Sequence, residues 1–267
     1  MVNEKIVSIV VINFNNEYGL RQTLKTVVRS KSSLVEIIVV DGLSSDNSMD
    51  VVHNFHDDID VIISEKDEGI YDAMNKGVSA SSGNSIIFIN SGDYIADDFD
   101  FNNFVIDNFE LFKDTIIYGG NFIKINDRIF RKNPYQYSKS KKILPSHQSI
   151  FVPKDYLVDN PFPVDMKVSS DSYVLLKAFD DLPSLKVDEY ISVFELGGVS
   201  NNWPNFKALL SHCKEYSTVR DKIFINVFVI FFVKFIFIKF LGYERYYTIT
   251  FSLREYFSDF RINNNKK

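Results

Sequence analysis

The stretch IVSIVVIN, residues 6–13, decides the fold class, because six of its eight residues are β-branched and it is too short for most helices. An amide at Asn15 or Asn16 can then cap a helix, in which Leu20, Leu24 and Val27 follow at helical spacing. A strand that runs directly into a helix is the basic unit of an α/β protein.

The same unit recurs along the first third of the chain. The further strand-like runs are VEIIVVD (35–41), DVIISE (60–65) and SIIFIN (85–90), and helical segments such as GIYDAMNKGV (69–78) separate them. Strands that are apolar on both faces and alternate with helices are typical of parallel sheets with right-handed crossovers. The sequence therefore predicts an α/β fold with a mainly parallel central sheet flanked by helices.

Beyond Asp97 the pattern is weaker. We expect a helix near residues 98–112, a strand at IIYGG (116–120), a hairpin through NFIKINDRIF (121–130) and a capped helix in VSSDSYVLLKAF (168–179).

Composition narrows the class of protein. The single cysteine, Cys213, excludes an internal disulfide framework, and the first residues lack the apolar run and cleavage site of a signal peptide. We therefore expect a cytosolic protein. Residues 205–267 carry eleven Lys/Arg against five Asp/Glu, whereas residues 1–204 carry nineteen against thirty. This asymmetry predicts one domain over 1–204 and a basic, Phe-rich helical extension over 205–267 that is attracted to an anionic surface.

Polar residues stand where the four strands end: Asn13, Asp41, Glu65 and Asp93. In open α/β sheets ligands bind beyond the carboxyl ends of the strands. Asn and Asp are also common in turns for backbone reasons alone. Four such endings together favour a binding site.

The glycine-rich loops that usually cradle a diphosphate are absent, since neither G-x-G-x-x-G nor G-x-x-x-x-G-K-[ST] occurs. A diphosphate bound here therefore needs a cation. Asp93 supplies the hard oxygen that a divalent metal prefers, and the small residues Ser91 and Gly92 allow close approach.

Several motifs, in this order, resemble those of the family 2 glycosyltransferases with the GT-A fold. They are VSIVVINFNN, VVDGLSSDNS, SEKDEGIYDAMNKGV, IIFINSGDYI, HQSIFVPK, SSDSYVLLKAF and GGVS, which together cover about residues 6–200. The likeness is strongest to bacterial enzymes that build exopolysaccharide, capsule or O-antigen. It implies inverting transfer of a sugar from a nucleotide-diphosphate sugar donor to a hydroxyl of a lipid-linked or polysaccharide acceptor, assisted by Mg²⁺ or Mn²⁺.

The resemblance also implies roles for single residues. Asp93 matches the last acid of the D-x-D metal signature, Asp171 matches the general base, and Asp41 matches the carboxylate that contacts the nucleoside. The other residues it assigns to nucleotide-sugar binding are Asn13, Asn15, Glu65, Asp72, Asn75, His147 and Gln148. The first acid of D-x-D is Asn90 here, so a single carboxylate is expected to hold the metal, weakly in the absence of donor.

Each of these roles has a plainer alternative. Asp171, with Ser169 and Ser170, can act as a helix cap, and His147 can be a structural group beside a strand. Asp72 and Asn75 can lie on an ordinary helix surface. The loss of the acid at Asn90 also leaves open a degenerate nucleotide-sugar-binding subunit that scaffolds a partner transferase, and glycoside hydrolysis through paired carboxylates stays formally open.

Residues 223–241, IFINVFVIFFVKFIFIKFL, contain sixteen apolar residues in nineteen and form a helix about 28 Å long, close to the thickness of a bilayer core. Spanning would export the basic excess that follows Leu241, against the positive-inside tendency. We therefore expect a helix lying in the cytoplasmic leaflet, so that the protein is peripheral to the inner face of the cell membrane. A helix packed on the domain or on a second copy is the alternative, which leaves a homo-oligomer open. Nucleic acid is not expected, because no Lys/Arg cluster is present.

Overall fold

The computed structural model describes residues 4–133, 137, 143–196 and 203–264, apart from the side chains of 254–264. The GGVS motif at 197–200 lies outside the described residues. The chain divides into two compact units, Met1–Asn121 with Asn133–Phe194 and Phe122–Lys132 with Glu195–Lys267. The predicted domains, 1–204 and 205–267, stay a prediction.

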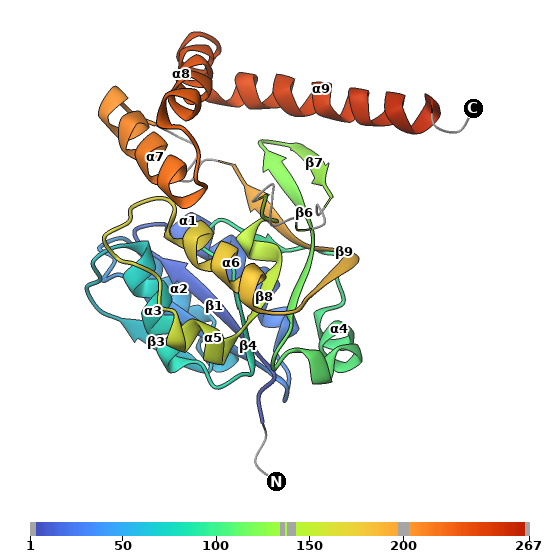
Figure 1. Ribbon diagram of the computed structural model, residues 1–267. Helices are drawn as coiled ribbons and strands as arrows, with labels where there is room; N and C mark the ends of the chain where they lie inside the picture. The colour runs from blue at the N-terminus through green and yellow to red at the C-terminus, as the bar shows by residue number, and fades with distance from the viewer. Residues whose placement is uncertain (1–3, 134–136, 138–142, 197–202, 265–267) are drawn as a thin grey trace. The chain divides into compact units, whose positions relative to one another are not determined.

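The first unit begins with the expected alternation of strands and helices (Figure 1). Its elements are β1 (Val7–Asn13), α1 (Glu17–Val27), η1 (Val28–Ser30), β2 (Val35–Asp41), α2 (Ser48–Asn54), η2 (His56–Asp58), β3 (Val61–Ser64), α3 (Ile70–Ala80) and β4 (Ser85–Phe88). β1 pairs in parallel with both β2 and β4, and β2 pairs in parallel with β3. Asn16 caps α1, since its Oδ1 accepts a hydrogen bond from Gly19 N at 3.1 Å.

The rest of the sheet contains antiparallel strand pairs. The elements are β5 (Tyr94–Ile95), α4 (Phe101–Asp107), η3 (Phe109–Leu111), β6 (Ile116–Ile125), β7 (Arg128–Lys132), η4 (His147–Ser149), β8 (Ile150–Pro153), α5 (Lys154–Asp159), α6 (Ser170–Asp181) and β9 (Ser184–Glu195). The strand order is β3-β2-β1-β4-β8-β6-β9-β5, with β7 paired to β6 as the predicted hairpin. The helix expected over 98–112 is shorter, because α4 ends at Asp107 and only a 3-10 turn follows.

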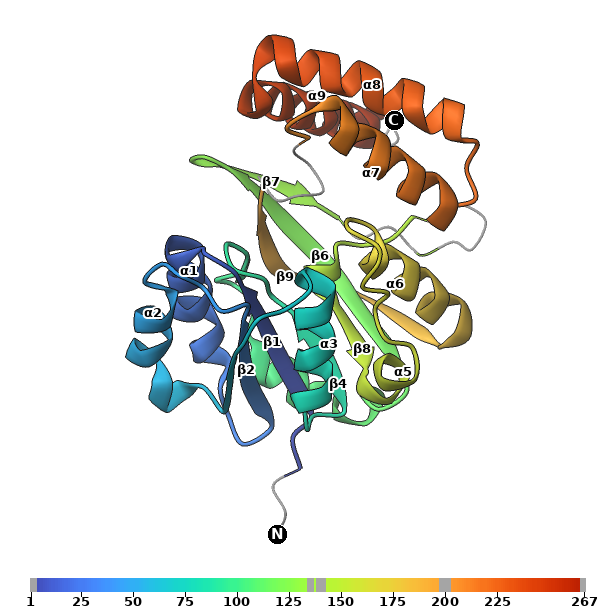
Figure 2. The same cartoon turned by 90° about the vertical axis from the view of Figure 1, so that its left-hand side faces the viewer.

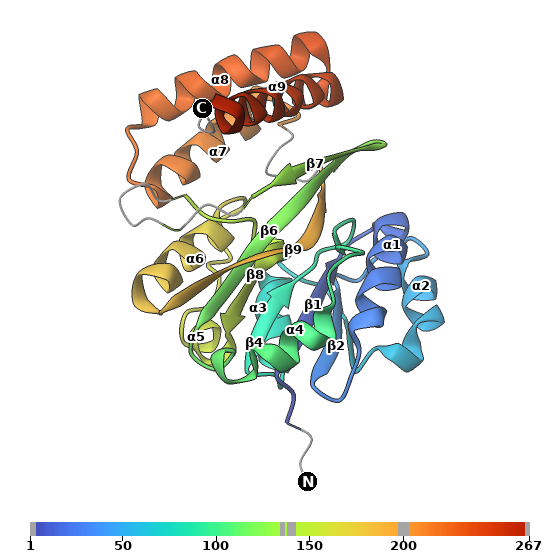
Figure 3. The same ribbon diagram turned by 90° about the vertical axis from the view of Figure 1, so that its right-hand side faces the viewer.

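Both faces of the sheet are covered. Val10 and Ile12 of β1 pack in one core with residues of α3, α5 and α6, which Figure 2 shows in front of the sheet. Ile9 and Val11 point to the other face and are fully buried as well. Figure 3 views that face, with α4 in front. Burial on both sides explains why these strands are continuous apolar runs.

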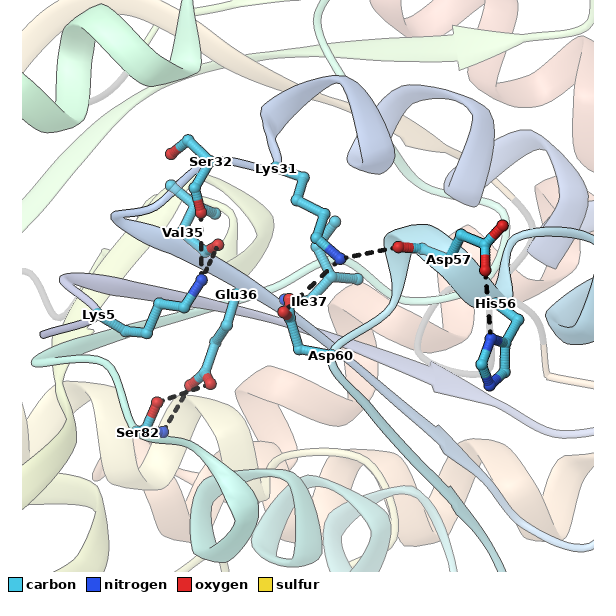
Figure 4. Close-up of polar contacts among 10 residues, drawn as sticks. All are labelled: Lys5, Lys31, Ser32, Val35, Glu36, Ile37, His56, Asp57, Asp60 and Ser82. Carbon is cyan, nitrogen blue, oxygen red and sulfur yellow. Dashed lines mark hydrogen bonds and ion pairs between the residues drawn. The ribbon is translucent and has the colours of Figure 1, made fainter. Parts of the chain in front are cut away.

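The Glu36 carboxylate is buried in this sheet, at the amino end of β2. Glu36 is 4% exposed, and its oxygens accept hydrogen bonds from Ser8 Oγ at 2.5 Å, Ser82 Oγ at 2.7 Å and Gly83 N at 3.1 Å. The backbone N–H of Ser82 also donates to it (Figure 4). Glu36 therefore joins β1, β2 and the turn that leads from α3 into β4.

We predict that Glu36→Gln lowers the free energy of unfolding by about 2 kcal/mol, because the four donors lose a charged acceptor and one acceptor oxygen becomes an NH₂ group. Urea denaturation measures this loss. The control is Glu110→Gln at an exposed position, which should change stability by less than about 0.5 kcal/mol. Equal stability of the two variants would contradict the role given to Glu36.

The described part of the second unit contains three helices, α7 (Phe206–Val219), α8 (Phe224–Leu241) and α9 (Tyr243–Asn264). Trp203, Leu209, Cys213 and Val227 form its small core, against which phenylalanines of α8 pack. Burial in this core, together with the charge of Lys234, lowers the pKa of His212 to about 4, so its ring is neutral at pH 7. By length and composition alone, α8 is the one helix in the described residues that is long and apolar enough to cross a membrane.

Candidate functional site

Asn13 and Asp41 meet where β1 and β2 end side by side. The Asn13 amide donates to Asp41 Oδ1 at 2.7 Å, and Ser44 Oγ donates to the same oxygen at 2.6 Å. Asp41 Oδ2 accepts from Ser44 N at 2.8 Å and from Ser64 Oγ at 3.3 Å. Asp41 is fully buried, and these four bonds use the acceptor capacity of its carboxylate.

The turn that follows β4 is attached to this network. Ser91 Oγ donates to Asn13 Oδ1 at 2.7 Å, and Asn16 Nδ2 donates to the Ser91 carbonyl at 3.1 Å. Thr23 of α1 accepts from Gly92 N at 3.0 Å and donates to the Asp93 carbonyl at 2.6 Å. Gly92 has φ +104°, which a side chain would strain. The small residues of this turn thus serve its backbone conformation.

Asp93 and Gln148 form a buried pair. Asp93 is 6% exposed and Gln148 is 3% exposed, and Gln148 Nε2 donates to Asp93 Oδ2 at 2.8 Å. Gln148 belongs to the 3-10 turn η4, which directly precedes β8. The amide therefore fixes the orientation of the carboxylate at the end of the β4 turn.

His147, the neighbour of Gln148, contacts Asp171. His147 Nδ1 lies 3.3 Å from Asp171 Oδ2, while Asp171 Oδ1 accepts from Tyr71 OH at 3.3 Å and from Ser172 N at 2.7 Å. The cap residue of α6 is Ser169, so Asp171 lies inside the first turn and does not cap the helix. Asp93 and Asp171 are thus each held by one of two adjacent residues.

The Asp171 carboxyl is set up to stay ionised. Burial alone raises the pKa of Asp171, but the hydrogen bond and charge of His147, with the bonds from Ser172 and Tyr71, lower it below its usual value. The same contact acts on Tyr71 in the opposite direction, because burial and the Asp171 charge raise the pKa of its hydroxyl well above the ordinary value. The Tyr71 hydroxyl therefore stays protonated and donates a hydrogen bond to Asp171.

The remaining predicted residues lie around this centre. Asn15 is exposed, and its Oδ1 accepts from Ser45 N at 2.7 Å. Glu65 and Asp72 both pair with Lys76, at 3.0 and 3.3 Å. Asn75 makes two 2.9 Å hydrogen bonds with the backbone of Phe162, so its amide holds the loop before α6.

Sequence reasoning missed several residues of the site. Thr23 and Tyr71 gave no signal, because each acts through a contact far away in sequence. Gly42 is also constrained, since a Cβ on it would lie 2.4 Å from Asp67 Oδ2 and 3.1 Å from the Phe14 ring. The Phe14 ring is 63% exposed. Gly42 therefore leaves room for an acidic group and an exposed aromatic ring beside the end of β2.

A divalent metal, which the resemblance implies, needs oxygen donors at this site. Among the described residues no group of three or more His, Cys, Asp or Glu could hold a metal ion. Asn90 Oδ1, however, is buried without a hydrogen-bond partner, and Asn90 Nδ2 lies 3.4 Å from His147 Nε2. One carboxylate and one amide oxygen suit a hard cation that keeps most of its ligands as water and phosphate. The residues fit such an ion, with few protein ligands.

Solved structures with a similar fold are glycosyltransferases. TarS of S. aureus, residues 1–349 in complex with UDP-GlcNAc, aligns with a TM-score of 0.55 and 16% identity over 83% of this chain and 69% of that chain. The mannosyltransferase PcManGT of Pyrobaculum calidifontis, in complex with GDP-Man and Mn²⁺, aligns with a TM-score of 0.56 and 14% identity over 80% of this chain and 62% of that chain. The GT-A type of α/β fold is thereby confirmed.

The family follows from the sequence comparison. The model of "Glycosyl transferase family 2" matches residues 8–154, more than half of the chain. The chain belongs to this family. An uncharacterized glycosyltransferase of Mycobacterium tuberculosis is 35% identical over 94 residues, which are 35% of this chain and 36% of that protein. A PGL/p-HBAD biosynthesis glycosyltransferase of Mycobacterium bovis is 30% identical over 89 residues, 32% of this chain and 35% of that protein. The matches thus span about a third of these relatives.

Proposed function

We propose that this chain transfers a sugar, with inversion, from a nucleoside-diphosphate sugar to a hydroxyl of a lipid-linked or polysaccharide acceptor in cell-surface glycan synthesis. The observation that carries the proposal is the arrangement around η4. Gln148 binds Asp93 and His147 contacts Asp171, so a donor-side and an acceptor-side carboxylate flank one short segment. A direct displacement needs these two functions close together.

Asp171 is the proposed general base. Its carboxylate is oriented by Tyr71 OH and Ser172 N on one oxygen and by His147 on the other. The lowered pKa of Asp171 keeps it deprotonated at neutral pH, so it can accept the proton of the attacking hydroxyl. His147 and Tyr71 are positioning residues in this scheme.

The donor nucleotide lies, in this proposal, beyond the ends of β1 and β2. Asp41 and Asn13 support this edge indirectly, because both are buried and bonded to each other. Asn15 belongs to the exposed surface that meets the nucleotide. We assign Glu65, Asp72 and Asn75 to the rim of the donor site, where the first two hold Lys76 near the diphosphate.

Asp93 and the Asn90 amide oxygen are the groups that would hold Mg²⁺ or Mn²⁺. Such an ion, when bound, offsets the charge of the departing diphosphate. Gln148 keeps the Asp93 carboxylate in place through its 2.8 Å bond, and His147 stands beside Asn90 at 3.4 Å. These two residues therefore connect the metal side with the base.

Two features of the second unit support the proposed acceptor and location. The apolar helix α8 and the basic balance of residues 205–267 support work at the inner face of the cell membrane, where a lipid-linked glycan is presented.

We predict that Asp171→Asn lowers turnover by about 10²- to 10⁴-fold and leaves donor binding unchanged, because only the proton acceptor is lost. The assay measures release of nucleoside diphosphate from UDP-GlcNAc and GDP-mannose, with and without glycolipid acceptor. The control is Asp155→Asn, an exposed aspartate in the first turn of α5. Full activity of Asp171→Asn would refute the base. Donor binding without turnover in the unmodified chain would favour the nucleotide-sugar-binding subunit instead.

The pH dependence of the rate tests His147. In the unmodified chain His147 helps to hold the pKa of Asp171 below its usual value, so a rate that needs the Asp171 carboxylate persists as the solution becomes acidic. In His147→Gln, burial raises the pKa of Asp171 with less opposition, and we predict that the acid limb of kcat/KM moves to higher pH. The control is His56→Gln, since His56 also lies near an aspartate, Asp57 at 3.7 Å, but is exposed. An unshifted acid limb in His147→Gln would contradict the contact's role.

Asn90→Asp tests the metal side through binding. A second carboxylate should lower the Mn²⁺ concentration at which UDP or GDP raises the melting temperature, by roughly tenfold. Thermal-shift titrations measure this concentration without any turnover. Asn102→Asp is the matched control, because Asn102 Oδ1 is also buried without a partner but belongs to α4. A changed Mn²⁺ dependence in Asn102→Asp alone would argue against Asn90 as a ligand.

A further inference from the structure

One side of α8 is an uninterrupted apolar surface. Its side chains are between 47% and 85% exposed, and we call them the outer stripe: Val229, Ile230, Val233, Ile236, Phe237 and Phe240. Their spacing of three and four residues places them on one face of the helix. An exposed stripe of this length on a helix marks an interaction surface.

Both lysines of α8 turn away from the outer stripe. Lys234 Nζ lies 4.8 Å from the ring centre of Trp203 and 4.9 Å from that of Tyr247. Lys239 Nζ donates to the Pro204 carbonyl at 3.3 Å. Each cation is therefore satisfied within the second unit, the first by aromatic faces and the second by a backbone oxygen. The outer stripe carries no charge.

The opposite side of α8 is covered by α7. Phe231 and Phe235 of α8 pack on the cluster of Leu209 and Cys213, as Figure 2 shows for the two helices running alongside each other. α7 also carries charged residues, including Lys207, Lys214 and Glu215. If α8 crossed a bilayer while packed in this way, those charges would enter the hydrocarbon, which is costly. The packing therefore favours α8 lying in the plane of a membrane.

The outer stripe continues into a groove between α8 and α9. The groove has a volume of about 500 Å³, and its lining includes Ile230, Val233 and Phe237 of α8 with Tyr246, Ile249 and Thr250 of α9. This size lies in the range of sites that enclose an organic ligand, about 300–1,000 Å³. A hydrocarbon chain matches the apolar side chains of this lining, which also includes Lys234. The excess of eleven Lys/Arg over five Asp/Glu in residues 205–267 adds attraction to an anionic surface.

We propose that the outer stripe of α8 and the adjoining groove dock in the plane of an anionic phospholipid leaflet. This inference deepens the membrane part of the proposed function and does not depend on sugar transfer. Apolar side chains enter the acyl boundary, while the basic residues of the unit attract the phosphate headgroups. The surface thus holds the chain on the membrane without spanning it.

Vesicle flotation of the 267-residue chain tests the proposal. We expect binding to phosphatidylcholine vesicles that contain phosphatidylglycerol, weaker binding to phosphatidylcholine alone, and release by alkaline carbonate. Ile236→Asp should weaken binding roughly tenfold or more, because an apolar side chain that enters the acyl boundary is replaced by a charge. Ile106→Asp is the matched control, since Ile106 is 57% exposed on α4 in the other unit, against 49% for Ile236.

Folding is checked by circular dichroism and by the fluorescence of Trp203, the chain's single tryptophan and part of the second unit's core. Phe240→Asp is the second variant, because an 85% exposed side chain contributes little to folding. Three outcomes would overturn the proposal: resistance to alkaline carbonate, equal binding of the Ile236→Asp and Ile106→Asp variants, or a dimer in solution that Ile236→Asp dissociates without any vesicle binding. If the unmodified chain binds vesicles but transfers no sugar, only the proposed enzyme activity is refuted.

Discussion

The register between β1 and β2 is the constraint on which the rest of the first unit depends. Asn13 is level with Asp41, so its amide reaches the carboxylate at 2.7 Å. A slip of one residue would turn Asn13 away from Asp41 and would exchange the residues of β1 that pack in the cores on the two faces of the sheet. Because Ser91 Oγ donates to Asn13 Oδ1, the slip would also release the turn that carries Asp93. Burial of the strand therefore determines where that carboxylate lies.

The parallel part of the sheet could be predicted from the sequence, because the pattern that indicates it lies within short segments of the chain. Residues 6–13 and 35–41 are apolar on both faces, and this pattern by itself requires helices on both sides. The same logic placed Asn13, Asp41 and Asp93 at one edge, since parallel strands have their carboxyl ends at the same edge of the sheet. The pattern did not predict the hydrogen-bond partners of each side chain. Asp41 is saturated by four hydrogen bonds, which depends on Ser44 and Ser64 as neighbours in space.

The other half of the site depends on geometry that spacing does not encode. His147 and Gln148 were visible as a pair of polar residues, but they lie in a 3-10 turn, where successive side chains point about 120° apart. This divergence allows Gln148 to meet Asp93 while His147 meets Asp171. The partners are 55 and 24 residues away in sequence, and β5, which follows Asp93, has only two residues. Local propensity is too weak to predict such pairings.

The second unit shows why counting charges along a helix is a poor guide to its environment. In the sequence, Lys234 and Lys239 interrupt an apolar run and count as a cost of insertion. In the structure, the Lys234 ammonium lies over the rings of Trp203 and Tyr247, so its charge is met by the unit itself. The free-energy cost of placing the outer side of α8 in lipid is thereby lowered. The cost of surrounding α8 with lipid on all sides stays high, because the charged residues of α7 would enter the lipid with it. In the docking that we propose, the same helix is favoured at an interface and disfavoured across a bilayer, and this difference arises from packing and not from composition.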